Sequence, residues 1–365
     1  MNDSVKKNTN ALISFAAVIV IVYGLQAAKV LLVPFLLAVL LALIAVRPML
    51  WLQKHKVPSA LAALLIVISM MLVLGAVGAI VGSSIADFTE ALPVYQARLD
   101  VIVQGTLNFA AQFVGDKKSF AELGALIDPG WAMGLAASIL NGLQDVLTNV
   151  FLILFTMVFI LLEASSMGTK VQAAFGRSTD TLEGPRKFLN NLGRYLGIKT
   201  VVSMVTGLTA TLLTWWIGLD FPLLWGMLAF LFNYVPTIGS IIAAVPAVLL
   251  ALVQLGPAEA TTTAIGFLAL NTLFGNIIEP RLMGYGVGIS PLVVFTGLIL
   301  WGWIFGPVGM LLSVPLSMTV KMALESDERT RWIAILIGSE RDAEYALARA
   351  RTLRESKERE KSHPL

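Results

Sequence analysis

The sequence predicts an all-α, polytopic transmembrane protein, and three observations support this fold class. The chain is 57% hydrophobic and 13% charged, whereas a soluble protein is about one quarter charged because its surface faces water. Long apolar segments recur along the chain. The stretches between them alternate between rich and poor in Lys and Arg, as expected when successive loops lie on opposite sides of a bilayer.

Eight apolar segments are expected to be membrane helices. All but the shortest are long enough to cross about 30 Å of hydrocarbon at 1.5 Å per residue. The sixth is long for one crossing and contains two prolines, so a broken or re-entrant path is an open alternative. The segments are 11–28, 30–46, 57–82, 146–162, 200–218, 223–254, 261–278 and 291–320.

The distribution of Lys and Arg predicts the orientation. Two basic residues precede the first segment, three lie in 47–56, six in 163–199 and nine after Lys321. Residues 83–145 contain three bases against seven acids, and 219–222 contain none. Because basic loops stay in the cytoplasm, both termini are predicted to be cytoplasmic, and 83–145 external.

The predicted organisation has five parts. Residues 1–82 form a transmembrane hairpin and a third helix, 146–199 a transmembrane helix and a cytoplasmic connector, and 322–365 a charged cytoplasmic helical tail. Between them, 83–145 form a small amphipathic helical extramembrane module, because apolar residues recur there at helical spacing; they include Phe88, Leu92, Tyr95 and Leu99. Residues 200–321 form the core region with broken helices.

Several function classes are disfavoured by what the sequence lacks. There is no cysteine, there are two histidines, and the net charge is +3, which argues against disulfides, thiolate metal sites and nucleic-acid binding. The chain contains no Walker A loop, no His-Glu-x-x-His motif and no nucleophile elbow. We therefore expect neither an enzyme nor a bound cofactor or metal, and passive or ion-coupled movement of a solute remains.

The candidate site residues are the charges that interrupt the core region. Between Thr200 and Val320 the only charged residues are Asp220, Glu259, Glu279 and Arg281. A charge inside a membrane helix costs about 2.5 to 3.5 kcal/mol on insertion scales, so such groups face a cavity or each other. We expect Glu279 to bind a proton or a cation.

Arg281 is expected to be the counter-charge of Glu279 or a contact for an anion. Pro280 removes one backbone donor and is expected to bend the chain between them, and Asn276 precedes them by one helical turn. The alternative is an interfacial ion pair that ends a helix and fixes the topology.

Two further breaks interrupt apolar runs. One contains Asn233, Pro236 and Gly239, and the other contains Gly306 and Pro307. A break frees backbone groups that must be satisfied by protein, water or a solute, and transporters place binding sites at such discontinuities. The alternative for each break is a kink packed by neighbouring helices, since Gly and Pro are frequent in membrane helices. Together, the breaks predict a translocation path.

The sequence around these breaks resembles the autoinducer-2 exporter (AI-2E, PerM-like permease) family. The resemblance covers nearly the whole chain in layout and is motif-specific beyond about residue 190. Its strongest signal is the combination of Glu279-Pro280-Arg281 with Gly306-Pro307-Val308-Gly309. The segments that carry it are 233–246, 276–284, 288–294 and 301–316.

This resemblance implies a transporter in the bacterial cytoplasmic (inner) membrane that exports a small polar solute such as autoinducer-2. It also implies a homo-oligomer, with a pentamer as one form. Some relatives look like sodium or lithium/proton antiporters, so ion exchange is a second hypothesis, in which protons or sodium would be partners. A non-transporting membrane scaffold is a third. In each case the lipid bilayer surrounds the chain.

Overall fold

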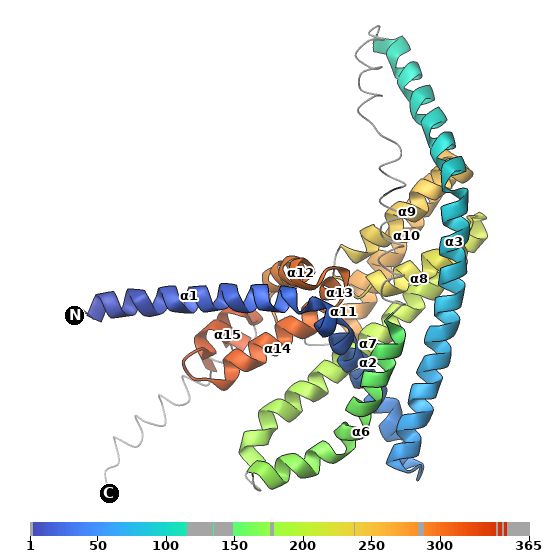
Figure 1. Ribbon diagram of the computed structural model, residues 1–365. Helices are drawn as coiled ribbons and strands as arrows, with labels where there is room; N and C mark the ends of the chain where they lie inside the picture. Colours follow the sequence, from blue (N-terminus) through green and yellow to red (C-terminus); the bar gives the residue numbers. More distant parts are fainter. Residues whose placement is uncertain are drawn as a thin grey trace, which may run out of the picture. The chain divides into compact units, whose positions relative to one another are not determined.

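The computed structural model describes residues 3–114, 134, 149–175, 179–236, 238–283, 288–340, 342–344 and 347–348 (Figure 1). The regular elements in these ranges are helices, which confirms the predicted all-α class. Four helical stretches are long and apolar enough to cross a membrane, namely Lys29–Lys54, Ser59–Thr106, Phe188–Ile217 and Pro257–Met283. Shorter apolar helices accompany them.

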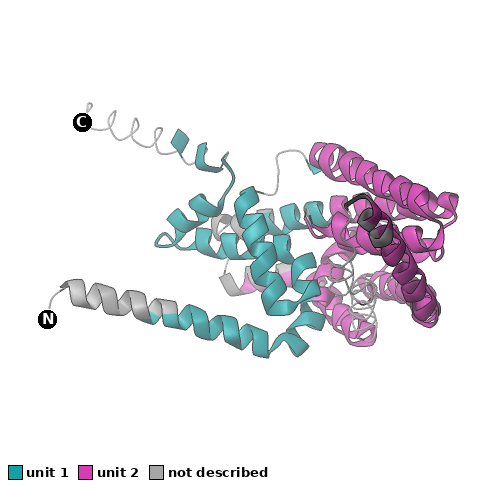
Figure 2. Ribbon diagram, turned by 90° about the horizontal axis from the view of Figure 1, so that it is seen from above, with its two compact units in different colours: residues 1–36, 175–196, 283–365 teal, residues 37–174, 197–282 magenta. Residues whose placement is uncertain are grey.

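The chain divides into two compact units (Figure 2). Unit 1 comprises residues 1–36, 175–196 and 283–365, and unit 2 comprises 37–174 and 197–282. Each unit therefore combines segments that are far apart in the sequence. The five parts predicted from composition do not follow this division.

One layer of unit 2 is built from α2 (Lys29–Lys54), α3 (Ser59–Val114) and α6 (Val150–Phe175). Small side chains at helical spacing on α2 let the helices approach closely, as is usual in membranes. The buried residues of this cluster are Ala38, Ala42, Ala45 and Met49 on α2, Ala62, Ala63 and Val67 on α3, and Ile153, Leu154, Met157 and Leu161 on α6.

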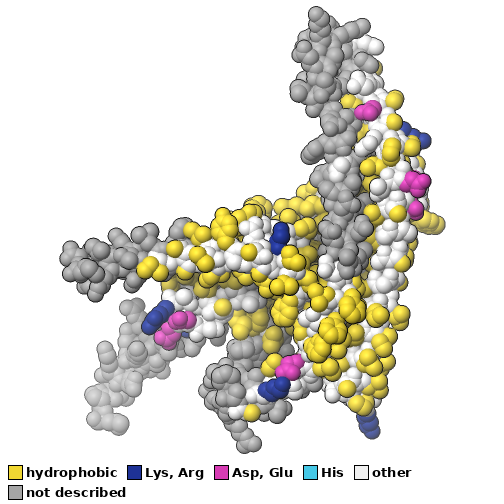
Figure 3. All heavy atoms as spheres, in the orientation of Figure 1, with side chains coloured by type: hydrophobic (Ala, Val, Ile, Leu, Met, Phe, Trp, Pro, Cys, Tyr) yellow, Lys and Arg dark blue, Asp and Glu magenta, His cyan; other side chains and the backbone are white. Residues whose placement is uncertain are grey.

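Large apolar side chains elsewhere on α3 are exposed, including Leu64, Ile68 and Leu72. Figure 3 shows the hydrophobic side chains spread widely over the visible surface, with few charges between them.

Helix α3 continues without interruption past residue 82 to Val114. Its second half is amphipathic, as predicted, and Phe88, Tyr95 and Leu99 are buried in a cluster with residues of two other helices, α8 (Pro222–Phe232) and α9 (Gly239–Gln254). The predicted boundary between 82 and 83 therefore lies inside a helix. Most of the rest of the predicted external module, 115–133 and 135–148, lies outside the described residues.

The core of unit 2 is a group of antiparallel helices. Besides α8 and α9 it contains α7 (Thr179–Ile217, in unit 2 from residue 197) and α10 (Pro257–Leu270), which continues as the π-helix η1 (Asn271–Ile278) and the short α11 (Glu279–Met283). The segment 223–254, for which a broken path was the open alternative, is a hairpin that reverses after α8. At its open end, the backbone N–H of Asp220 donates to Oε1 of Gln254 at 3.0 Å.

Two glycines make this hairpin and its contact with α7 possible. At the reversal, a Cβ on Gly239 would overlap the carbonyl of Phe232 at the end of α8. On α7, a Cβ on Gly207 would lie 2.7 Å from the carbonyl oxygen of Gly226 on α8. Close backbone approach through small residues is a common mode of helix packing in membranes.

Unit 1 contains a second hairpin where one segment, 291–320, was expected. Helix α12 (Pro291–Phe305) ends at Gly306, whose φ of 69° reverses the chain into α13 (Pro307–Leu311) and α14 (Ser313–Ser326). Trp301 donates from Nε1 to Oγ of Ser317 across the hairpin at 3.2 Å. At about 22 Å, α12 is shorter than the hydrocarbon core.

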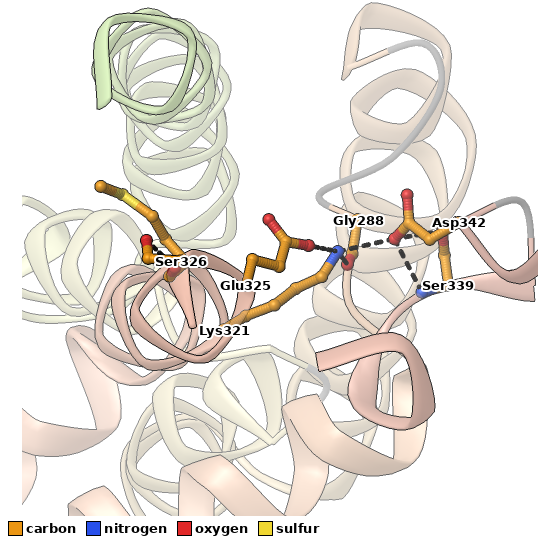
Figure 4. A network of polar contacts seen from close by, with 7 residues as sticks. Gly288, Lys321, Glu325, Ser326, Ser339 and Asp342 are labelled. Carbon is orange, nitrogen blue, oxygen red and sulfur yellow. Dashed lines mark hydrogen bonds and ion pairs between the residues drawn. The ribbon is translucent and has the colours of Figure 1, made fainter. Parts of the chain in front are cut away.

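The open end of this second hairpin is fixed by Lys321 (Figure 4). Its ammonium donates to the carbonyl oxygen of Gly288 at 2.6 Å and to Oδ2 of Asp342 at 2.7 Å. Asp342 also accepts hydrogen bonds from the backbone N–H and the hydroxyl of Ser339, both at 3.1 Å. Lys321 thereby joins the residues that precede α12 to those that follow α15 (Arg331–Ile337).

We predict that Gly226→Ala lowers the free energy of unfolding in detergent by about 1 to 3 kcal/mol, the usual cost of overpacking. The added Cβ would overlap the hydroxyl of Thr211 and lie 2.6 Å from the carbonyl oxygen of Gly207. Gly75→Ala on α3 is the control, because no atom lies within 4 Å of its added Cβ. Equal stability of the two variants would contradict the packing described.

We predict that Asp342→Asn lowers the hydrogen-exchange protection of the Ser339 amide at pH 7. Burial raises the pKa of the Asp342 carboxyl. The hydrogen bonds from Lys321 and Ser339, together with the positive charge of Lys321, outweigh this effect and hold the pKa below 3.8. A carboxyl with a lowered pKa stabilises the folded protein fully at pH values above 3.8, and this stabilisation is lost as the pH falls through the pKa of the folded state. The difference in Ser339 protection between Asp342→Asn and wild type should therefore shrink only below pH 3.8.

Glu325→Gln is the matched control for Asp342→Asn. Its carboxylate is 3.4 Å from the same ammonium and is 51% exposed, so it should change the protection little. A larger loss of protection in Glu325→Gln than in Asp342→Asn would show that Asp342 does not hold this segment.

Candidate functional site

The most buried ion pair in the described part of the chain joins Lys199 to Glu279. Nζ of Lys199 lies 2.6 Å from Oε1 and 2.7 Å from Oε2 of Glu279. The two side chains are 5% and 15% exposed. Such a pair holds two charges away from water, which is costly unless each compensates the other.

Glu279 reaches this position at the end of a π-helix. In η1 each hydrogen bond spans five residues, and the backbone N–H of Glu279 donates to the carbonyl of Phe274. A π-helical segment shifts the side chains that follow it around the helix axis, and such segments occur frequently at functional sites. The sequence pattern did not predict this element.

Two polar contacts surround the reversal between α8 and α9. Asn233 donates from Nδ2 to Oγ of Ser203 at 2.8 Å, and the hydroxyl of Tyr234 donates to Oγ1 of Thr200 at 2.7 Å. Thr200 and Ser203 lie within about one turn of Lys199 on α7. The reversal and the ion pair therefore lie at the same end of the antiparallel group.

We call Lys199, Glu279, Asn233, Ser203, Tyr234 and Thr200 the polar end site. Five of the six come from two elements, α7 and the reversal, and the sixth from the end of the π-helix. Lys199, Ser203 and Tyr234 are buried. The site offers a cation, an anion and neutral hydrogen-bonding groups close together, which suits recognition of a small polar molecule or ion.

The structure differs from the sequence analysis over the counter-charge of Glu279. Arg281 is exposed and makes no ion pair with any residue in the described ranges. The chain is helical from Glu279 to Met283, through Pro280. Residues two apart on a regular helix point in different directions, so the ammonium of Lys199 takes the position expected for Arg281.

The other predicted site residues fall into three groups. Asn233 belongs to the polar end site, and Pro236 and Gly239 shape the reversal that carries it. Asn276 and Pro280 are exposed. Gly306 and Pro307 form the turn between α12 and α13 in unit 1, whereas the polar end site is in unit 2 (Figure 2).

Lys199 was not predicted as a site residue and counted only among the charges that set the orientation. A signal was present in the spacing of polar residues along α7. Lys199, Ser203, Thr206 and Thr214 recur at three- to four-residue intervals or multiples of them, and all four are buried. A polar stripe on an otherwise apolar helix indicates a face turned toward protein.

Comparisons with known proteins identify the family of this chain. The profile described as AI-2E family transporter matches residues 12–328. The AI-2 transport protein TqsA of Escherichia coli is 37% identical over 89% of this chain and 94% of its own length. A putative transport protein of Haemophilus influenzae is 35% identical over 91% of this chain and 97% of its own length. The putative transport protein YhhT of Escherichia coli is 32% identical over 91% of this chain and 95% of its own length.

We predict that Lys199→Met destabilises the protein by about 3 to 5 kcal/mol, because it leaves the Glu279 carboxylate buried without its partner. The double variant Lys199→Met/Glu279→Gln should recover most of this loss. Unfolding in detergent, followed by circular dichroism, measures both.

The matched control is the pair of Lys170 and Glu163, which has the same 2.6 Å separation but is 61% and 48% exposed. Lys170→Met should change the stability by at most about 1 kcal/mol. If Lys199→Met/Glu279→Gln were as unstable as Lys199→Met, the loss of stability would not come from the pairing of Lys199 with Glu279.

Proposed function

We propose, on the premise that this chain belongs to the AI-2E transporter family, that the polar end site binds the transported solute. The solute is a small polar molecule, which the protein exports across the bacterial cytoplasmic membrane. Family membership makes the chain a multi-pass membrane transporter. The solute, its direction and the residues that bind it are our proposal.

The observation that carries this proposal is the buried contact of Lys199 with Glu279. Replacement of a buried ion pair by apolar residues is often neutral or stabilising, so such a pair is weak support for a purely structural role. Ionisable residues inside membrane segments commonly mark substrate or ion pathways. Here the pair lies beside a helix reversal, the kind of discontinuity at which transporters bind solutes.

The composition of the site favours a small solute with several hydrogen-bonding groups. Lys199 and Glu279 cancel in charge, so a neutral molecule can bind without an unpaired charge in the site. Asn233, Tyr234 and Ser203 add donors and acceptors at the same end. We propose Arg281, which is exposed nearby in the sequence, as the first contact for a solute approaching the site.

One relative is named as an AI-2 transport protein, which supports an autoinducer-2-like molecule as the solute. The Lys and Arg distribution supports cytoplasmic termini, and the resemblance to the autoinducer-2 exporter family is the basis for proposing outward transport. We also propose a homo-oligomer, with a pentamer as its form, because the resemblance to the family implies it. The scaffold hypothesis has weaker support, since the similar chains are named as transport proteins.

One observation favours a sodium (or lithium)/proton antiporter as the second candidate function. The ammonium of Lys199 contacts both carboxylate oxygens of Glu279. It thus occupies the position in which a monovalent cation would bind to this carboxylate. A cation that binds Glu279 would have to displace this ammonium. Proton release from Lys199 would then accompany cation binding.

We predict that Glu279→Gln and Lys199→Met each reduce solute flux at least tenfold in proteoliposomes. Each removes one charge of the site and leaves the other without its partner. Uptake or release of labelled small polar solutes, including autoinducer-2, is measured with and without a proton gradient. Lys170→Met, which alters an exposed pair, should retain flux within about twofold of wild type.

Flux of solute at the wild-type rate in both site variants, with correct folding shown by size-exclusion chromatography, would overturn the proposed site. A pH-sensitive dye inside the vesicles distinguishes the two functions. Sodium-dependent proton movement that Glu279→Gln abolishes would favour the antiporter. Solute flux without such movement would favour export.

A further inference from the structure

A second polar cluster lies at the end of the antiparallel group opposite the polar end site. The hydroxyl of Tyr95 on α3 donates to Oδ2 of Asp220 at 3.0 Å. The backbone of Asp220 is bound as well, because its N–H donates to Oε1 of Gln254 and its carbonyl accepts from Nε1 of Trp225 at 2.7 Å. Asp220 thus connects α3 with the α7–α8 turn and the end of α9.

The two clusters lie at the two ends of the part of α7 that belongs to unit 2, residues 197–217. Lys199 belongs to the polar end site, and α7 ends at Ile217, immediately before the turn that contains Asp220. At 1.5 Å per residue, these ends are roughly 27 Å apart. A solute that moves along this helix group from the polar end site meets the second cluster last.

The contacts of Asp220 are of two kinds. Its backbone bonds to Gln254 and Trp225 are made within the α7–α10 group, and they hold the turn in place. Its side chain is exposed and bonds outside that group to one partner among the described residues, Tyr95. This side-chain bond adds a polar contact to the apolar packing of α3 against α8 and α9, so α3 can leave the turn only when the bond and the neighbouring aromatic contacts both separate.

Aromatic rings close the space next to this bond. Phe88 of α3 packs against Phe221 and Trp225 with edge-to-face geometry, at centroid distances of 6.2 Å for both. Aromatic side chains bury large apolar areas, and edge-to-face pairs of rings are favourable. The backbone here is also unusual, because Phe221 has a φ of 58°, a conformation that is strained for a large side chain and that occurs often at switch regions.

A shallow, open hollow lies on the surface of α3 and α9, and its lining does not include Tyr95 or Asp220. Its volume is about 690 Å³, and it is lined by α3 residues between Pro93 and Ile102 and by Val253. Tyr95 lies between two of the lining residues in sequence, and Gln254 follows Val253. A molecule released between α3 and α9 would enter this hollow.

We propose that the Tyr95–Asp220 contact, with the aromatic rings beside it, is a gate of the transport path at the end remote from the polar end site. The proposal rests on the proposed function. The gate is closed in this structure and opens when the bond breaks and α3 moves away from the α7–α8 turn. The turn 219–222 carries no basic residue, so the gate faces the outside.

The experiment uses the natural absence of cysteine. Cysteines are introduced together by Tyr95→Cys and Asp220→Cys, and a short bis-methanethiosulfonate reagent links them in proteoliposomes. The link should reduce solute flux at least tenfold, and a reductant should restore it. A control link between cysteines at Val94 and Arg98, one turn apart on α3, does not cross the contact and should leave flux within about twofold of the unlinked protein.

A second measurement reports gate opening without a cross-link. The reporter is Ser203→Cys, a buried position in the polar end site. Tyr95→Phe keeps the ring but removes the bond to Asp220, and should increase labelling of this cysteine by a charged thiol reagent added from the outside at least fivefold. Thr89→Val removes only a hydrogen bond within α3 and should leave labelling unchanged.

Full solute flux through the linked Tyr95–Asp220 pair, or unchanged labelling in Tyr95→Phe, would overturn the gate. The polar end site is tested separately by Glu279→Gln. If the link blocks flux but Glu279→Gln transports normally, the gate is retained and the polar end site is rejected. If Glu279→Gln abolishes flux but the link has no effect, the gate is rejected and the polar end site is retained.

Discussion

A buried charge or an unpaired peptide group finds no hydrogen-bond partner in hydrocarbon, and the arrangement of unit 2 depends on this constraint. Lys199 and Glu279 come from segments 80 residues apart, and each gives the other the partner that lipid cannot. At the reversal between α8 and α9, the polar side chains of Asn233 and Tyr234 find their hydrogen-bond partners on α7. The polar groups gather at one place because each needs the others.

The same constraint explains why much of the fold could be predicted from the sequence. Segments without charge must be helices inside a bilayer, and composition alone identifies them. The amphipathic spacing of Phe88, Tyr95 and Leu99 also indicated the face that is buried. Hydrophobicity does not show whether an apolar run crosses or returns, however. The runs 223–254 and 291–320 both fold back, and the backbone of Gly239 and Gly306 decides this locally.

The candidate site could be predicted only in part, for a physical reason. Glu279 and Asn233 stood out because they are polar residues in apolar surroundings. Lys199 did not, because it lies at the edge of an apolar run, where a lysine usually extends its charge to the membrane surface. Its burial depends on tertiary packing, and its partner Glu279 directly follows the π-helix, which has no clear sequence signal. Sequence proximity therefore favoured Arg281 as the partner, whereas three-dimensional proximity favours Lys199.

The close approach at Gly239 has a consequence for the polar end site. Because the carbonyl of Phe232 occupies the space that a Cβ at position 239 would need, a side chain there would push the start of α9 away from the end of α8. Asn233 and Tyr234 follow Phe232 directly, and their hydrogen bonds reach α7. One methyl group at position 239 would therefore displace two residues of the site without touching a solute.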